Sequence, residues 1–185
     1  MEIKITTNQI LKVLQVLSWI IFIGLCVEAG GVLVNTIITT FINPEGVRNF
    51  WDGADYLSNV YKFDQGYFLV ITLVMIIVAV LKTIMFYLIV KLFIDKKLSI
   101  SQPFSIELKH FILIQVFLAL GIGFFARLGY KYTVWLTEHG VMAANLQSLN
   151  MDGADVWFFM AIVLFIIVQV VNRGIEIQQE NDLTI

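Results

Sequence analysis

Three ionisable side chains stand inside long apolar stretches of the sequence: Glu28, Lys82 and Arg127. A charge at membrane depth is costly, so such residues usually pair with one another or line a path for ions or substrates. Counted at about 1.5 Å per residue from the lysines at the ends of the stretches, all three lie roughly 21 to 27 Å deep. We expect Glu28 to pair with Lys82, with Arg127 nearby, because an isolated buried charge would neutralise or draw in water.

Small and polar residues share helical faces with these charges. The spacings i, i+4, i+7 and i+11 in the first stretch, and every fourth residue in the third, each describe one side of a helix. These polar packing faces comprise Gly24, Glu28, Gly31 and Asn35, and then Gln115, Ala119, Gly123 and Arg127. Such faces should contact protein rather than lipid. Two interpretations stay open: an ion or substrate relay, or a fixed ion pair that sets helix register.

An acidic tetrapeptide occurs twice. Asp52-Gly53-Ala54-Asp55 is repeated as Asp152-Gly153-Ala154-Asp155, each time ahead of an apolar helix. Hard cations prefer oxygen ligands, which makes these four aspartates the candidates for a metal site. Capping of the following helices explains the same residues more simply, because a carboxylate accepts hydrogen bonds from the free amides of a first turn. We expect no metal site.

Signatures of catalysis are missing from the sequence. The chain has no H-E-x-x-H, G-x-S-x-G, P-loop or G-x-G-x-x-G motif, and its two histidines, His110 and His139, are expected at opposite membrane faces. One cysteine, Cys26, excludes a dithiol pair within the chain. We therefore predict a protein that is not an enzyme and that holds no cofactor.

The elements that position these residues follow from composition. Of 185 residues, 59% are hydrophobic and 14% charged, whereas soluble domains have roughly 45–50% and 25%. Four apolar stretches, at about 10–42, 67–94, 104–132 and 156–177, are each long enough to cross a bilayer. The prediction is an all-α integral membrane four-helix bundle, with residues 1–185 forming one transmembrane domain. Scattered basic residues give no patch for direct nucleic-acid binding.

Positive charges predict the orientation. Seven Lys or Arg residues belong to the N-terminus, the hairpin between the second and third stretches, and the C-terminal end, while four lie on the opposite side. Short loops rich in Lys and Arg stay in the cytoplasm. Both termini should therefore be cytoplasmic, in a multi-pass protein of the cell membrane. The longer connections, at about 43–66 and 133–155, should carry interfacial or short extramembrane structure outside.

The end of the chain carries a resemblance. The segment from Arg173 to Ile185, RGIEIQQENDLTI, follows an apolar helix containing Gln169, and the hairpin ends in Gln102-Pro103-Phe104-Ser105. With the layout of four spans, these features resemble a bacterial family catalogued as domain of unknown function two-nine-seven-five. The resemblance implies a bacterial inner-membrane protein, often encoded beside a small helix-turn-helix regulator, and it supplies no catalytic residues.

Two functions compete on this sequence. The first is a non-enzymatic accessory or regulatory membrane protein, whose cytoplasmic hairpin and acidic C-terminal tail contact a protein partner, with a homo-oligomer as a further option. The alternative is a small ion-coupled transporter or channel that works through Glu28, Lys82 and Arg127. A hydrated path to the buried charges would distinguish the transporter from the accessory protein.

Overall fold

The computed structural model describes residues 7–95 and 104–182, so Lys4 and the hairpin lysines Lys96 and Lys97 lie outside the described residues. Helices form this part of the chain, without strands among the described residues. In chain order they are α1 (Thr7–Ile37), η1 (Ile38–Ile42), η2 (Pro44–Asn49), η3 (Trp51–Gly53), α2 (Ala54–Phe63), α3 (Gln65–Ile94), α4 (Ile106–Glu138) and α5 (Ala154–Asp182).

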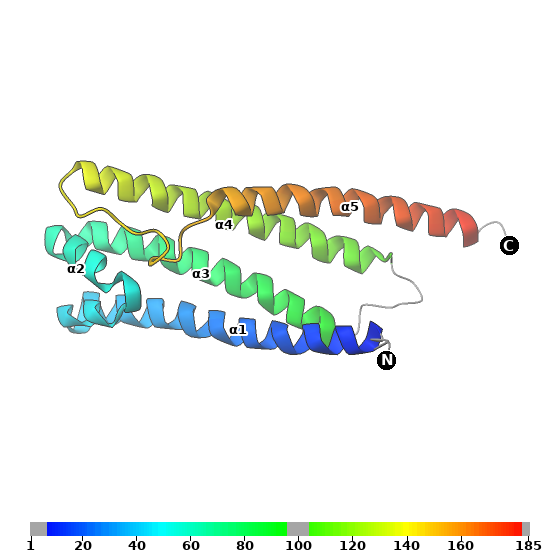
Figure 1. Ribbon diagram of the computed structural model, residues 1–185, viewed down its shortest axis with the longest axis horizontal. Coiled ribbons are helices and arrows are strands. Elements are labelled where there is room, and N and C mark those ends of the chain that lie inside the picture. The colour runs from blue at the N-terminus through cyan, green and yellow to red at the C-terminus, as the bar shows by residue number, and fades with distance from the viewer. Residues whose placement is uncertain (1–6, 96–103, 183–185) are drawn as a thin grey trace, which may run out of the picture.

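Four of these helices are long and apolar enough to cross a membrane: α1 continued by η1, α3, α4 and α5. The predicted all-helical fold with four membrane-capable segments is thus confirmed. Two of the helices are longer than expected, since α4 runs to Glu138 and α5 to Asp182. The short helix α2 lies inside the stretch 43–66, which the sequence predicted as a connection with interfacial or short extramembrane structure. Both described ends of the chain lie at the same end of the molecule (Figure 1).

The four long helices pack as a row. Extensive contacts join α1 to α3, α3 to α4, and α4 to α5, with neighbours antiparallel (Figure 1). Helix α1 therefore has α3 as its principal neighbour among the long helices. Its other sides expose apolar side chains from Ile10 to Ile42, which suits a helix surrounded by hydrocarbon.

Helix ends are fixed by capping residues. Asp64 accepts a hydrogen bond from the Tyr67 amide at the start of α3, and Ser105 accepts one from the Leu108 amide at the start of α4. Each satisfies an amide that has no partner inside its own helix. At the other end of α4, Gly140 has a φ of 96°, a conformation that glycine adopts at little cost and that ends a helix.

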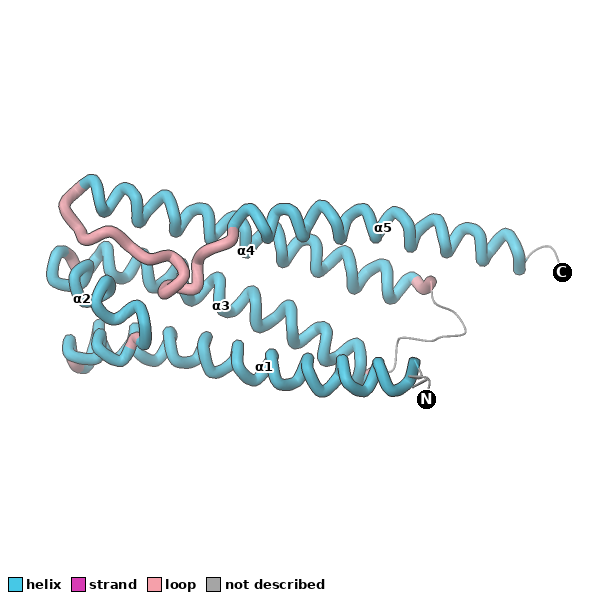
Figure 2. Tube along the Cα trace, viewed as in Figure 1, coloured by secondary structure: helices cyan, strands magenta, loops and turns pink. Residues whose placement is uncertain are grey.

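Buried side chains form two cores. The membrane core joins α3, α4 and α5 and consists of Val78, Met85, Ile112, Val116, Ala119, Ile122, Ala161, Val168 and Val171. A second core lies under a cap, which we define as residues 44–63 together with the loop 139–153 (Figure 2). Its members include Leu57, Val60, Phe68, Leu136 and Leu149, all with no exposed surface. The two longer connections are therefore folded structure with their own hydrophobic core.

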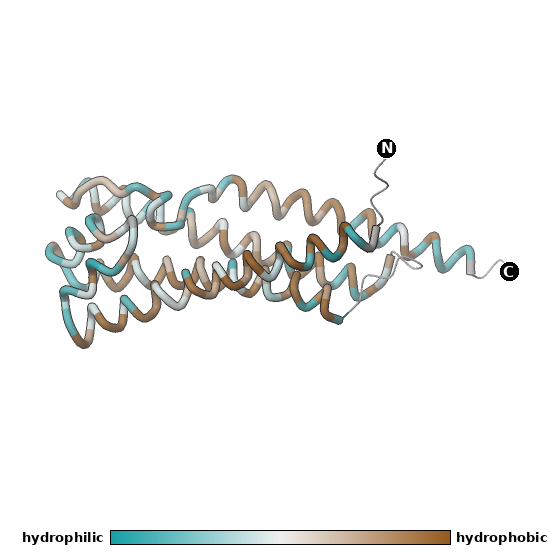
Figure 3. The backbone as a smooth tube through the Cα atoms, turned by 60° about the horizontal axis from the view of Figure 1, so that its bottom comes forward, coloured by the Kyte–Doolittle hydropathy of each residue, from teal (hydrophilic) through white to brown (hydrophobic). Residues whose placement is uncertain are grey.

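The exposed side of α4 changes character along its length. Ile114, Phe117, Leu120 and Phe124 are exposed and apolar, and the same stripe continues as Arg127 and Lys131, which are exposed and charged. Helix α5 also begins near this level, because Gly123 lies against Ala154 and Phe158. Hydrophilic residues are frequent beyond it, in the cap, and at the far end of α5 (Figure 3). On α4, the pattern indicates that the apolar layer ends near Arg127.

We predict that Tyr56→Phe stabilises the cap. Tyr56 is 4% exposed, and its hydroxyl has no hydrogen-bond partner among the described residues. Burial, and secondarily the nearby Tyr132, raises the pKa of Tyr56 to about 12. An unpaired buried hydroxyl is destabilising, so the variant should gain about 1 kcal/mol in free energy of unfolding.

The same substitution should change the dependence of stability on pH. The folded protein favours the neutral phenol, so wild-type stability is intact below pH ~10 and falls as pH rises toward ~12. Tyr56→Phe lacks this loss. Unfolding in micelles at pH 8 and pH 11 would measure both effects, with Tyr130→Phe, which removes an exposed phenol, as the control. Destabilisation at pH 8 would contradict the prediction.

Candidate functional site

Lys82 joins the membrane-spanning part of α3 to the cap. Its Nζ donates a hydrogen bond to the backbone carbonyl oxygen of Asn150 at 3.0 Å. Side chains of a helix lean toward its N-terminus, and in α3 that direction leads to the cap. Asn150 itself has a φ of 54°, which asparagine tolerates better than most residues. The lysine thus places its charge at the loop 139–153 while its stem stays among apolar neighbours.

Glu28 lies close to this lysine. Both Glu28 and Asp152 are near enough to attract the Lys82 ammonium electrostatically, and the side chain of Glu28 is half-buried. The hydrogen-bond acceptor is the Asn150 carbonyl, so Glu28 acts at longer range than a direct ion pair. The structure therefore places Glu28 within electrostatic range of Lys82 but shows no direct ion pair between them, and it adds Asp152 and a backbone carbonyl to the group.

Arg127 departs from the expected charge layer. Its side chain is exposed, and its guanidinium lies 5.7 Å from the centre of the Tyr130 ring. Gly121 packs against Leu81, so Arg127, six residues further along α4, lies about 9 Å nearer the cap than Lys82 does. The adjacent Ala126 is fully buried, and consecutive helix residues point about 100° apart. Arg127 is consequently turned away from the core.

Polar residues of the spans hydrogen-bond backbone carbonyls of neighbouring elements. Gln115 Nε2 donates to the Met85 carbonyl at 3.1 Å, joining α4 to α3. Thr83 Oγ1 shares its single hydrogen between the Ala79 carbonyl of its own helix at 2.8 Å and the Leu25 carbonyl of α1 at 3.2 Å. Asn35 Nδ2 donates to the Asn49 carbonyl at 2.9 Å, joining α1 to the cap. Each bond satisfies a donor that would be expensive to leave unpaired in hydrocarbon and fixes one element against the next, although Gln115 Oε1 is buried without a partner among the described residues.

The two glycines of the predicted polar face behave differently. A side chain at Gly31 would collide with the ring of Trp51, so this glycine allows the cap to approach α1. No atom lies within 4 Å of a side chain built at Gly24, a position that is exposed. The packing part of the face therefore begins nearer the cap than the sequence pattern suggested, and it ends at Asn35.

The repeated acidic tetrapeptides come near one another at the cap. Gly53 of the first repeat lies close to Leu149 and to the Ser148 carbonyl, shortly before the second repeat. Among the described residues, no group of three or more His, Cys, Asp or Glu side chains has the geometry to hold a metal ion. Asp55 and Asp155 stand in the first turns of α2 and α5, where a negative charge favours the helix dipole. The side chain of Asp52 lies outside the described part.

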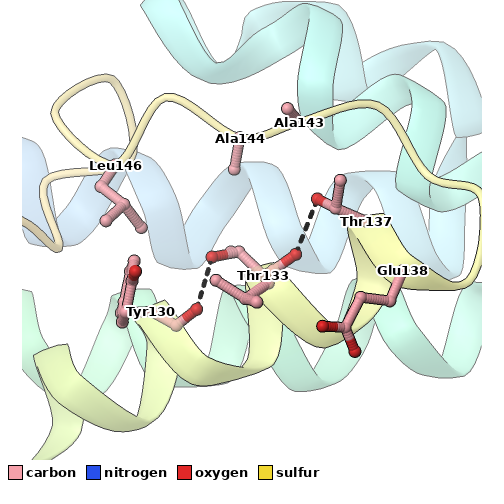
Figure 4. Close-up of a pocket in the computed structure, with 8 residues that line it drawn as sticks. Tyr130, Thr133, Thr137, Glu138, Ala143, Ala144 and Leu146 are labelled. Carbon is pink, nitrogen blue, oxygen red and sulfur yellow. Dashed lines mark hydrogen bonds between the residues drawn. The ribbon is translucent and has the colours of Figure 1, made fainter.

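A hollow of about 330 Å³ lies between α4 and the loop 139–153 (Figure 4). Its lining includes Tyr130, Thr133, Thr137 and Glu138 from α4, facing Ala144 and other loop residues. The two threonine hydroxyls donate to the carbonyls of Tyr130 and Thr133, at 2.8 Å and 3.0 Å. Those hydroxyl hydrogens are used within the helix, so the hollow presents mainly an apolar wall with one carboxylate at its edge.

Sequence reasoning missed the role of Asn150. Its contribution to the site is a backbone carbonyl, which every residue type carries, so no side-chain pattern identifies it.

The two histidines lie far apart in the structure. His139 Nδ1 is 2.8 Å from the Trp135 carbonyl oxygen in the cap, whereas His110 lies at the other end of α4, in a groove shared with α3. The two histidines therefore lie near opposite ends of α4, which agrees with their predicted separation.

Comparison of the chain with models of protein families, with curated proteins and with solved structures gave no match. The family resemblance of the C-terminal segment accordingly stays a prediction. Function must be inferred from the described geometry itself.

We predict that Lys82→Met loosens the cap. The substitution leaves the Asn150 carbonyl without its donor and removes the cation that attracts Glu28 and Asp152. A hydrogen bond to a charged group contributes about 1.5–3 kcal/mol, and unfolding in mixed micelles should show a loss of that order. Amide hydrogen exchange should rise in residues 146–152. Arg127→Met, the matched control on an exposed cation, should change stability by less than about 0.5 kcal/mol.

A double-mutant cycle with Glu28→Gln tests the electrostatic part. If Glu28 and Lys82 interact, removing the carboxylate should cost less in the Lys82→Met background than in the wild type, with a coupling energy of about 0.5–3 kcal/mol. Strict additivity of the two single changes would show that Lys82 serves the loop alone.

Proposed function

We propose that this protein is a non-enzymatic accessory or regulatory membrane protein, which binds a protein partner through its hairpin end. The observation that carries the proposal is the extension of α5. Helix α4 begins at Ile106, and Gly174 packs against Phe104 just before that start. Helix α5 nevertheless continues to Asp182. Residues 176–181 therefore project past the row of helices as a regular, polar helix.

A network of polar contacts supports the base of this extension. Lys109 Nζ donates to Asn172 Oδ1 at 2.6 Å, which joins α4 to α5. Asn172 Nδ2 and Arg173 Nη1 then donate to the two carboxylate oxygens of Glu176, at 3.0 Å and 2.8 Å. Short isolated helices are marginal in water, so this preformed stem lowers the ordering cost of binding. The acidic residues Glu176 and Glu180 favour a basic surface on the partner.

The interior of the spans favours the same proposal. Gln115 and Thr83 donate to backbone carbonyls of adjacent helices, and Lys82 donates to a carbonyl of the cap. Groups engaged in this way fix register and hold elements together, as expected of a structural scaffold. We further propose that both termini are cytoplasmic, following the excess of positive charge at this end, and that the membrane is the bacterial inner membrane, as the family resemblance implies.

The alternative is an ion-coupled transporter or channel, favoured by the placement of Glu28 next to Lys82 inside the spans. It requires water to reach these groups. On the cap side, a cavity of about 70 Å³ lies over Asn150, lined also by Val32, Trp51 and Met75. A path from the opposite end would have to pass the membrane core.

Site-specific photo-crosslinking tests the accessory function. A crosslinking residue at the exposed Gln179 should yield a discrete heteromeric adduct in cells, because the extension is the proposed contact. The matched control is Phe165, exposed on the lipid-facing part of the same helix, which should give none. Reversing the charge of Glu180, which lies beyond the network at the base of the extension, with Glu180→Lys should weaken the adduct. Equal labelling at the two positions, or an adduct indifferent to charge reversal, would argue against the proposal.

Cysteine accessibility tests the transporter. In a Cys26→Ser background, single cysteines at the buried positions Val78, Met85 and Ile122 should resist membrane-impermeant thiol reagents added from either side. Cysteines at Gln147 in the cap and Gln179 in the extension, both exposed, serve as positive controls. Rapid labelling at the buried positions would reveal a hydrated path and favour transport.

A further inference from the structure

A groove of about 260 Å³ lies between the ends of α3 and α4 that are nearest the hairpin. The two helices separate toward this end (Figure 1). Helix α3 and its C-terminal cap contribute Leu88, Lys91, Leu92 and Asp95, and helix α4 contributes Glu107, His110, Phe111 and Ile114. Within each set the spacing is i, i+3, i+4, i+7, so each helix presents a single face to the groove.

Antiparallel packing orders the chemistry of this groove in layers. Deepest in the membrane are apolar groups, with Leu88 on α3 and Ile114 on α4. About one helical turn outward come Lys91 and His110, and outermost are Asp95 and Glu107. From the membrane interior toward the aqueous phase, the groove is therefore apolar, then basic, then acidic.

This order matches one class of membrane lipid. A phospholipid with an ethanolamine headgroup has acyl chains, then a phosphate, then a primary ammonium separated from the phosphate by an ethylene unit. With its chain along Leu88, Ile114 and Phe111, its phosphate would meet the basic layer and its ammonium the acidic layer. Charge-assisted hydrogen bonds of both signs are strong and directional. An anionic glycerol headgroup would offer the acidic layer only neutral hydroxyl donors and no cation, so its match is weaker.

We propose that this groove is a binding site for a phosphoethanolamine lipid. Lys91 and His110 hold the phosphate, while Glu107 and Asp95 accept hydrogen bonds from the ammonium. Four polar side chains in the lining agree with a site that orients its ligand through a few placed polar groups on an apolar floor. The site is independent of the partner surface on α5, because none of its lining residues belongs to that helix.

Native mass spectrometry of the full-length protein tests the site. Delipidated protein is mixed with equimolar phosphatidylethanolamine, phosphatidylglycerol and phosphatidylcholine. We expect preferential retention of phosphatidylethanolamine. Phosphatidylcholine carries the same phosphate and a cation without N–H donors, so its retention should be about tenfold weaker. Equal retention of the three lipids would overturn the proposal.

Two variants separate the two charged layers. Glu107→Gln should lower the affinity for phosphatidylethanolamine about tenfold while leaving that for phosphatidylglycerol unchanged, since only the ammonium loses its partner. Unchanged glycerol-lipid binding also shows that the variant is folded. Lys91→Met should weaken both lipids, because both contain the phosphate. Asp55→Asn and Lys62→Met, exposed on α2 in the cap, are the matched controls and should alter neither.

A soluble competitor distinguishes the lipid from its headgroup. Glycerophosphoethanolamine has the same phosphate and ammonium but no acyl chain. It should fail to displace the bound lipid at equal concentration, because the apolar floor contributes to binding. Displacement of the lipid at equal concentration would contradict the proposal. So would a loss of selectivity for phosphatidylethanolamine in the two cap variants as large as the loss in Glu107→Gln.

Discussion

A polar group inside hydrocarbon must find its hydrogen-bond partner within the protein, and the arrangement of the spans depends on that constraint. Polar side chains on these helices meet it by donating to backbone carbonyls: Lys82 to Asn150, Gln115 to Met85, and Thr83 both to Ala79 of its own helix and to Leu25 of α1. A carbonyl occupies a fixed place in its helix or loop. Each such bond therefore fixes both distance and register, whereas apolar packing between helices in lipid permits sliding.

These bonds also couple two regions that would otherwise be separate. The membrane core holds α3, α4 and α5 together, and the cap core holds residues 44–63 and the loop 139–153 on the outer parts of α3 and α4. Lys82 crosses from the first region to the second. Its ammonium, attracted by Glu28 and Asp152, lies where apolar surroundings give way to polar ones. The ammonium at that level is attracted by a carboxylate of α1 and by one of the loop 139–153, which explains why a lysine occurs in an otherwise apolar helix.

Hydropathy alone predicted the four long helices, because twenty or more apolar residues have few alternatives to a span. It could not predict α2, a helix of 10 residues with mixed polarity whose stability comes from the cap core.

Arg127 illustrates a second limit of prediction from the sequence. Spacing by fours placed it on the face of Gln115 and Ala119, but that row drifts by about 40° at each step, and by Arg127 it has turned to the outside. The sequence could not identify Asn150 as the partner of Lys82, because Asn150 contributes a backbone carbonyl oxygen.

The register between α4 and α5 explains why the two ends of the molecule differ. A close contact fixes it: Gly123 of α4 lies against Phe158 of α5, while Gly129 lies against Met151 in the loop and Gly174 against Phe104 just before α4. A larger side chain at Gly123 would press on Phe158 and on the Ala154 carbonyl, so the pairing of α4 with α5 tolerates little sliding. In this register α4 overhangs α5 at one end, where the loop 139–153 fills the space beside it and builds the cap. At the other end α5 overhangs α4, and its polar extension reaches beyond the membrane core. One packing register thus produces both the folded cap and the projecting helix, because sliding α5 toward the hairpin end would lengthen both overhangs and sliding it toward the cap would shorten both.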